Sequence, residues 1–114
     1  MFQVDLKQED GIAVARLRGD FFGDGVDEFA ESLHETAFAA EAQVAIDLSG
    51  LSAIDSSGLS AMINLVTRAR LNDSRIILVA PTPLVAGVFH ATRLDTWFDL
   101  APNLADARSQ LLSS

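Results

Sequence analysis

Cysteine is missing from this chain of 114 residues, which removes several kinds of protein from consideration. Without it there are no disulfides, no thiolate ligands for zinc and no cysteine nucleophile, so packing alone must hold the fold together, as it does in the reducing cytoplasm. No run reaches the roughly 18 consecutive apolar residues of a membrane-spanning helix. The opening MFQVDLKQED has neither the basic region nor the apolar core of a signal peptide. We therefore expect a cytoplasmic protein that does not insert into a membrane.

Basic side chains are also scarce, because 8 Lys and Arg stand against 16 Asp and Glu. The imbalance lies in the first half of the chain, where residues 1–50 carry 11 acids and 3 bases, whereas residues 51–114 carry 5 of each. From Asp20 to Glu41 there are seven acids and no base. This segment would repel phosphate backbones and anionic lipid, which argues against nucleic-acid binding. It is either the solvated face of a helix or an acidic patch that attracts a basic partner.

What the chain does contain is enough apolar material for one core. Its 49% hydrophobic content and its length suit a compact domain, and no internal repeat or low-complexity segment interrupts it. We expect a single domain over residues 1–114.

The hydrophobic pattern near the N-terminus predicts a hairpin. Residues 2–6 alternate between apolar and polar side chains, which is the period of a half-buried strand, and Asp10-Gly11 supplies a tight turn into a second strand over residues 12–18. We expect that strand to end at Gly19-Asp20 and a loop containing glycines to lead into a helix. The apolar positions of that helix recur with helical spacing at Val26, Phe29, Ala30, Leu33 and Ala37.

Two later strands are predicted from short apolar runs. Residues 44–48 and 76–79 are rich in branched apolar side chains, and the second run is apolar throughout, which is typical of strands buried on both faces. Between them, a loop over residues 49–55 should precede a helix whose apolar face spans residues 59–69.

The C-terminal third shows clear helix starts. Thr82 followed by Pro83 is an N-cap with proline at the first helical position, and Asn103 should cap the last helix. Trp97-Phe98 is expected to form an edge strand. The resulting order, β-β-α-β-α-β-α-β-α, predicts an α/β domain with a mixed, mostly parallel sheet of about five strands and four helices packed on it.

One junction combines features that could carry chemistry. It runs from Asp47 to Leu59, where a strand leads into a helix start, and it contains the adjacent hydroxyls of Ser56 and Ser57. A helix start presents unsatisfied N–H groups and the positive end of the helix dipole, so it tolerates a phosphate. Phosphorylation of Ser56 would add about −1.5 to −2 charges at neutral pH.

Such a charge would act on a partner rather than on the fold. Beside Asp55, and with Asp20 or Asp24 from the preceding loop, a phosphate in an interface would face desolvation and like-charge repulsion. Gly58 lacks a side chain, so we expect it to let a partner approach Ser56 closely. The alternative is that this segment only caps a helix and that nothing modifies it.

Other chemistry finds little support in the residues. There is no nucleophile elbow, no P-loop and no G-x-G-x-x-G, so we expect no enzymatic activity. His34 and His90 have no second ligand three or four residues away, and Asp47 with Asp55 would supply too few oxygen ligands for a hard cation. We therefore expect neither a metal nor another cofactor.

The residues around this junction resemble a known family. The strand Val44–Leu48 followed by Ile54–Leu59, which reads IDSSGL, resembles the signature of STAS domains, and in particular of bacterial anti-sigma factor antagonists. The similarity extends over almost the whole chain and includes residues 17–20, 83–89 and 94–98. The resemblance implies a STAS-like fold.

The resemblance also implies a function. In the family, a serine at the position of Ser56 is phosphorylated by a cognate kinase that doubles as an anti-sigma factor, with Ser57 as the alternative acceptor. The unmodified protein binds the kinase and frees a sigma factor, the modified protein lets go, and a metal-dependent serine phosphatase resets the switch. We expect the partner-binding surface to comprise Asp20, Asp24, Asp55, Ser56, Ser57 and Gly58.

One difference from the family concerns the partner. Family members often carry Gly-Glu-Leu-Asp before the first helix, whereas residues 19–24 here read GDFFGD, so Phe22 replaces the second acid. Asp24 could take that role, or an exposed Phe21-Phe22 pair could mark a different partner surface. Two other roles stay open: a subunit docked on the ATPase of a lipid-type transporter, and a relay in a larger signalling assembly without a sigma factor.

Overall fold

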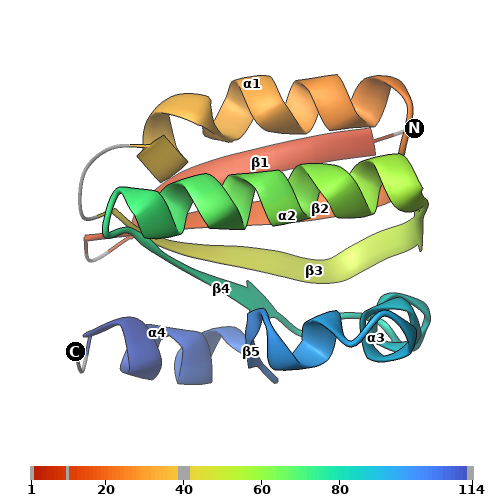
Figure 1. Cartoon of the computed structure of the whole chain (residues 1–114). Coiled ribbons are helices and arrows are strands. Elements are labelled where there is room, and N and C mark those ends of the chain that lie inside the picture. The colour runs from red at the N-terminus through yellow and green to blue at the C-terminus, as the bar shows by residue number, and fades with distance from the viewer. Residues whose placement is uncertain (1, 10, 39–41, 113–114) are drawn as a thin grey trace.

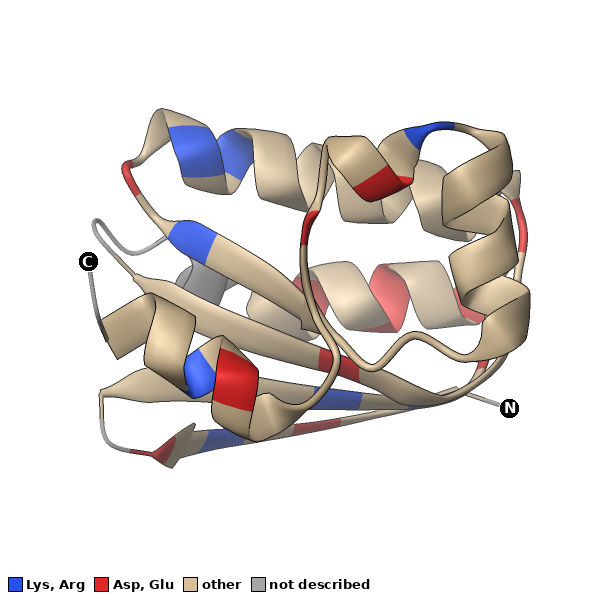
Figure 2. Cartoon of the chain, turned by 90° about the horizontal axis from the view of Figure 1, so that it is seen from below, with Lys and Arg blue, Asp and Glu red and all other residues tan. Residues whose placement is uncertain are grey.

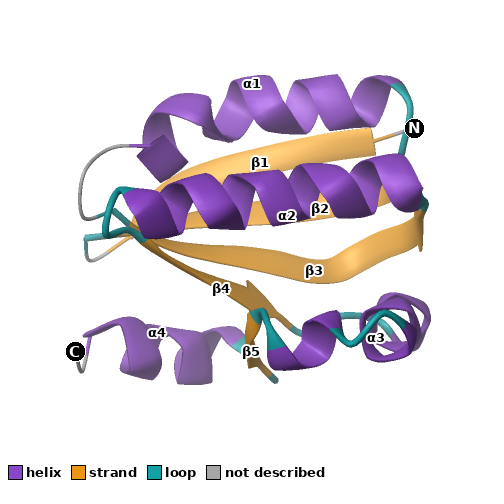
Figure 3. Ribbon diagram, in the orientation of Figure 1, coloured by secondary structure: helices purple, strands orange, loops and turns teal. Residues whose placement is uncertain are grey.

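The computed structural model of the chain describes residues 2–9, 11–38 and 42–112. Helices and strands alternate along most of the sequence after an initial hairpin (Figure 3). The elements are β1 (Phe2–Glu9), β2 (Ile12–Phe21), α1 (Asp24–Phe38), β3 (Gln43–Ile54), α2 (Ser56–Leu71), β4 (Arg75–Val79), α3 (Pro83–Ala91), the 3-10 helix η1 (Leu94–Thr96), β5 (Asp99–Ala101) and α4 (Leu104–Leu112). This is the predicted order of strands and α-helices.

The strands form one five-stranded sheet in the order β1-β2-β3-β4-β5. β1 runs antiparallel to β2, and the pairs β2-β3, β3-β4 and β4-β5 are parallel. Parallel neighbours need a crossover connection, which α1, α2 and α3 supply in turn. The α/β class and the mixed, mostly parallel sheet that the sequence predicts are therefore confirmed.

The helices lie on both faces of the sheet. Figure 1 shows α1 and α2 on one side of the strands and α4 on the other. The larger hydrophobic cluster joins residues of α1, α2 and α3 to the sheet, and a smaller one lies between the sheet and α4. In α2 the buried residues Met62, Leu65, Val66 and Ala69 follow the helical spacing of a single apolar face.

Two predicted strand ends are wrong, because β2 and β3 continue past them. β2 extends through Gly19 to Phe21, and β3 runs on to Ile54, so residues 49–54 form a paired strand rather than a loop. Register shifts between Arg16 and Arg18 and after Gly19 let the two strands stay paired. The glycine and serine residues of this stretch favour turns, which is why the sequence predicts a loop. In the structure they belong to an irregular part of the sheet.

The prediction of an edge strand at Trp97-Phe98 is also wrong, since β5 begins at Asp99. Phe98 is instead buried, with its ring centroid 5.0 Å from that of Phe89 and 5.2 Å from that of Trp97. These rings therefore pack against α3 and the core, and the strand pairing starts after them.

The predicted helix starts at Thr82 and Asn103 are confirmed. The Thr82 hydroxyl accepts a hydrogen bond from the N–H of Val85, and the Asn103 side chain accepts one from the N–H of Asp106 at 2.8 Å. The predicted turn residue Asp10, and the side chain of Ala37 on the first predicted helix, lie outside the described part of the chain.

Candidate partner-binding site

The two candidate serines are the first two residues of α2. The helix begins here because Asp55 has extended backbone angles, φ −118° and ψ −173°, and its Oδ1 accepts a hydrogen bond from the N–H of Gly58 at 3.0 Å. The Ser57 hydroxyl donates to the same Oδ1 at 2.6 Å. Ser56 and Ser57 are both exposed. The sequence therefore places a capped helix start directly after the long strand β3.

The two hydroxyls differ in their surroundings. Ser57 is bound to the Asp55 carboxylate, whereas no hydrogen bond of the Ser56 hydroxyl is found among the described residues. The Ser57 side chain, and after it the N–H of Gly58, lower the pKa of Asp55 below its ordinary value of 3.8. At neutral pH the carboxylate is ionised, so a negative charge is fixed next to the exposed hydroxyl of Ser56.

Gly58 has a role inside the domain. It is buried, and a Cβ atom built on it would lie 2.2 Å from the backbone O of Phe21 and 2.9 Å from its ring. The missing side chain therefore lets the first turn of α2 approach the end of β2. The expectation that this gap admits a partner is corrected, because the space faces Phe21.

Asp20 lies near the end of β2, next to the start of α2. The strand register pairs Asp20 with Ala53 and Phe21 with Ile54, the residue before Asp55. Asp20 is thus a half-buried strand residue and not part of a loop, which corrects the expectation. Asp24 is exposed and is the first residue of α1.

Phe21 and Phe22 do not form an exposed pair. Phe21 is fully buried, with its ring 5.2 Å from that of Phe2 and 4.9 Å from that of Phe29, whereas Phe22 is 41% exposed. The inward position of Phe21 continues the alternation of Ala13, Ala15 and Leu17 along β2. That period of two is the sequence signal that identifies Phe21 as a core residue.

The two helices beside this site differ in the charge of the residues that they carry (Figure 2). The first turn of α1 contains Asp24 and Asp27, whereas the basic residues of α2, Arg68 and Arg70, lie in its last turn, at the opposite end from Ser56. Asp55 thus supplies negative charge beside Ser56, and the first turn of α2 contains no basic residue.

Nothing in the described residues forms a metal site, since no cluster of three His, Cys, Asp or Glu side chains occurs there. Asp47 does not face Asp55 but lies earlier on β3, where its carboxylate is 3.8 Å from the guanidinium of Arg16. His90 is exposed and lies 3.1 Å from Asp95, and the His34 side chain falls outside the described part.

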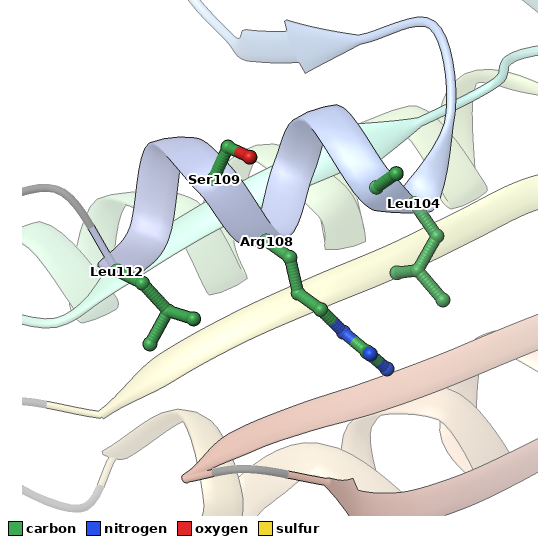
Figure 4. A pocket seen from close by; sticks show the side chains of 5 residues that line it. Leu104, Arg108, Ser109 and Leu112 are labelled. Carbon is green, nitrogen blue, oxygen red and sulfur yellow. The ribbon is translucent and has the colours of Figure 1, made fainter.

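Two cavities formed by the described residues lie away from the serines. One, of about 680 Å³, is an open depression on α4, lined by Leu104, Arg108 and Leu112 among others (Figure 4). There the Arg108 side chain reaches toward β1, where it pairs with Glu9. A smaller groove of about 260 Å³ runs between α1 and α2. Neither Ser56 nor Ser57 lines either of these two cavities.

Comparison with known proteins identifies the fold. An anti-sigma factor antagonist of Mycobacterium paratuberculosis has a TM-score of 0.85 and 22% identity, with 97% of this chain and 94% of that chain covered. A Thermotoga maritima protein assigned to the same class has a TM-score of 0.86 and 18% identity, with coverage of 95% and 93%. The antagonist SpoIIAA in its unphosphorylated form has a TM-score of 0.80 and 23% identity, with 98% of both chains covered.

These likenesses concern structure, and no curated protein is significantly similar to the chain in sequence. Among the described residues, no helix has both the length and the hydropathy needed to cross a bilayer. The model of the STAS domain family matches residues 3–107. With the five-stranded sheet and the capped start of α2, this match shows that the chain belongs to the STAS domain family.

Proposed function

We propose that the chain is a non-catalytic partner-switching protein of the anti-sigma factor antagonist type, acting in the cytoplasm. In its unmodified form it binds a serine kinase that also serves as an anti-sigma factor, and it releases this partner when Ser56 is phosphorylated. A serine phosphatase returns it to the binding state. The observation that carries the proposal is the exposed Ser56 hydroxyl at the start of α2, beside the fixed carboxylate of Asp55.

Support also comes from the structural neighbours. SpoIIAA, an anti-sigma factor antagonist of Bacillus, is known in both an unphosphorylated and a phosphorylated form. Its resemblance to this chain is one of fold, and the position of Ser56 at the start of α2 is what makes the same chemistry reasonable here.

Electrostatics explain how one phosphate would act. The phosphate adds about −1.5 to −2 charges to a protein whose net charge is already −8. At the exposed helix start the dipole favours this charge by about 0.3–1 kcal/mol, so α2 stays intact. A partner that covers Ser56 must instead desolvate the phosphate beside the ionised Asp55. A loss of about 2.8 kcal/mol in binding free energy corresponds to a hundredfold weaker complex.

The first test asks which serine accepts phosphate. The purified chain is incubated with ATP, Mg²⁺ and each host protein that carries a histidine-kinase-like ATPase domain, and phosphate is detected by a phosphate-binding gel and by mass spectrometry. We expect one kinase to modify the wild-type chain and the Ser57→Ala variant, but not Ser56→Ala. Modification of Ser56→Ala to the wild-type level would disprove the assignment.

The second test measures binding to that kinase by calorimetry. The wild-type chain and Ser56→Ala are expected to bind, and Ser56→Glu should bind at least about a hundredfold more weakly. Equal binding of all three would contradict the switch. Stable co-purification with a transporter ATPase, unaffected by Ser56→Glu, would favour the transporter role instead.

A further inference from the structure

Phe22 is an exposed aromatic residue in a protein that buries its other described phenylalanines. Phe2, Phe21, Phe29, Phe89 and Phe98 are at most 8% exposed, whereas Phe22 is 41% exposed and belongs to neither hydrophobic cluster. The fold therefore leaves a large part of this ring in contact with solvent. Aromatic side chains, including phenylalanine, are enriched at protein interfaces.

The backbone holds Phe22 in place. Its neighbour Phe21 is fixed in the core between the rings of Phe2 and Phe29. On the other side, Gly23 has φ +59°, and the N–H of Gly25 donates to the O of Phe22 at 3.1 Å. Because the chain is held in place before and after Phe22, its backbone loses little conformational entropy when a partner covers it.

Along the backbone, Phe22 lies close to the switch serine. Phe21 is paired with Ile54, so Phe22 and Asp55 are the next residues of two neighbouring strands as they leave the sheet. A partner large enough to cover Ser56 would also cover this position, since a typical interface takes about 800 Å² from each protein.

The charges around Phe22 indicate what kind of partner surface would fit it. Phe22 is flanked in sequence by Asp20 and Asp24, and no Lys or Arg occurs anywhere in residues 19–67. An apolar anchor within an acidic surface is complementary to an apolar pocket with a basic rim. Such a rim would also place positive charge close to the Asp55 carboxylate.

We infer that Phe22 is an anchor of the partner-binding surface and inserts into an apolar pocket, rimmed by Lys or Arg, on the protein that binds unmodified Ser56. This inference rests on the proposed function for the identity of the partner. It adds a specificity-determining contact that a chain with an acid at this position would lack.

The test measures how substitutions at two exposed apolar residues change the affinity for the kinase identified above. Phe22→Ala should bind at least about 30-fold more weakly, which is about 2 kcal/mol, whereas Phe22→Trp should retain binding. Leu71→Ala is the matched control, because Leu71 is 80% exposed and lies at the far end of α2. Unchanged thermal unfolding shows that all three variants fold. Wild-type affinity of Phe22→Ala would overturn the inference and leave the role of Ser56 intact.

A second arm applies if no kinase acts on Ser56, in which case the proposed function fails separately. The photocrosslinker p-benzoylphenylalanine is placed at position 22, and at position 71 for comparison, in cells of the source organism. A protein crosslinked only from position 22, whose purified form binds Phe22→Ala at least about 30-fold more weakly than the wild type, supports the anchor. The absence of such a protein overturns it.

Discussion

At the scale of single residues, Asp55 links the helix start to the chemistry of its neighbours. One carboxylate oxygen accepts from the Ser57 hydroxyl at 2.6 Å and from the N–H of Gly58 at 3.0 Å. Ser57 is therefore used in the cap, and Ser56 is the hydroxyl that we propose as the site of phosphorylation. This division gives two identical side chains different roles within one turn of helix.

Replacing Asp55 by Ala should lower the thermal midpoint by a few degrees at pH 7. The hydrogen bonds to the Asp55 carboxylate lower its pKa in the folded protein below the unfolded value, which is near 3.8. The stability that Asp55 contributes is therefore fully present above pH 3.8. It is lost as the pH falls through the lower pKa of the folded protein. Thermal unfolding followed by circular dichroism from neutral to acidic pH should therefore show the difference from wild type shrinking below pH 3.8. Asp55→Asn, which keeps a capping oxygen, is the control, and a difference independent of pH would contradict this account.

At the scale of elements, the approach of α2 to β2 depends on Gly58. A Cβ at this position would lie 2.2 Å from a backbone oxygen of Phe21, and a backbone atom in a paired strand cannot move away without disturbing the sheet. The clash therefore outweighs the better helix propensity of alanine.

Gly58→Ala is expected to destabilise the protein by about 1–3 kcal/mol, measured by urea unfolding. Gly87→Ala is the matched control, since Gly87 lies on α3 and a Cβ added to it would have no neighbouring atom within 4 Å. That substitution should stabilise the protein by about 0.5–1 kcal/mol. Equal effects of the two substitutions would show that the contact with Phe21 does not govern the packing of α2.

At the scale of the whole molecule, the net charge of −8 opposes the compact state. Ion pairs between Arg and acid offset part of it, as between Arg16 and Asp47 and between Arg108 and Glu9. Exposed pairs of this kind contribute little, so the unscreened repulsion of the acids should dominate.

We therefore expect salt to stabilise the fold. Raising NaCl from about 10 mM to about 500 mM shortens the screening length from about 30 Å to below 8 Å, and the thermal midpoint should rise by a few degrees. Glu31→Gln, at an exposed position of α1, should reduce this rise. A midpoint that falls with added salt would mean that the ion pairs outweigh the repulsion.

Much of the molecule can be predicted from local patterns. Periodicity identifies the elements and their order, and the caps at Thr82 and Asn103 follow from residue types within one helical turn. The position of Ser56 at a helix start is predictable for the same reason, because Asp55 acts through contacts no more than three residues away. These features depend on neighbours in sequence and are therefore readable without a fold.

Only the tertiary structure decided which residues that are distant in the sequence contact each other. The pairing of β2 with β3 over residues 49–54 and the close contact between Gly58 and Phe21 both join segments that are distant in the sequence. The sequence by itself determined which elements form and where a hydroxyl meets a helix start. The fold determined which surface surrounds that hydroxyl, because strand register and packing arise from contacts that no local pattern contains.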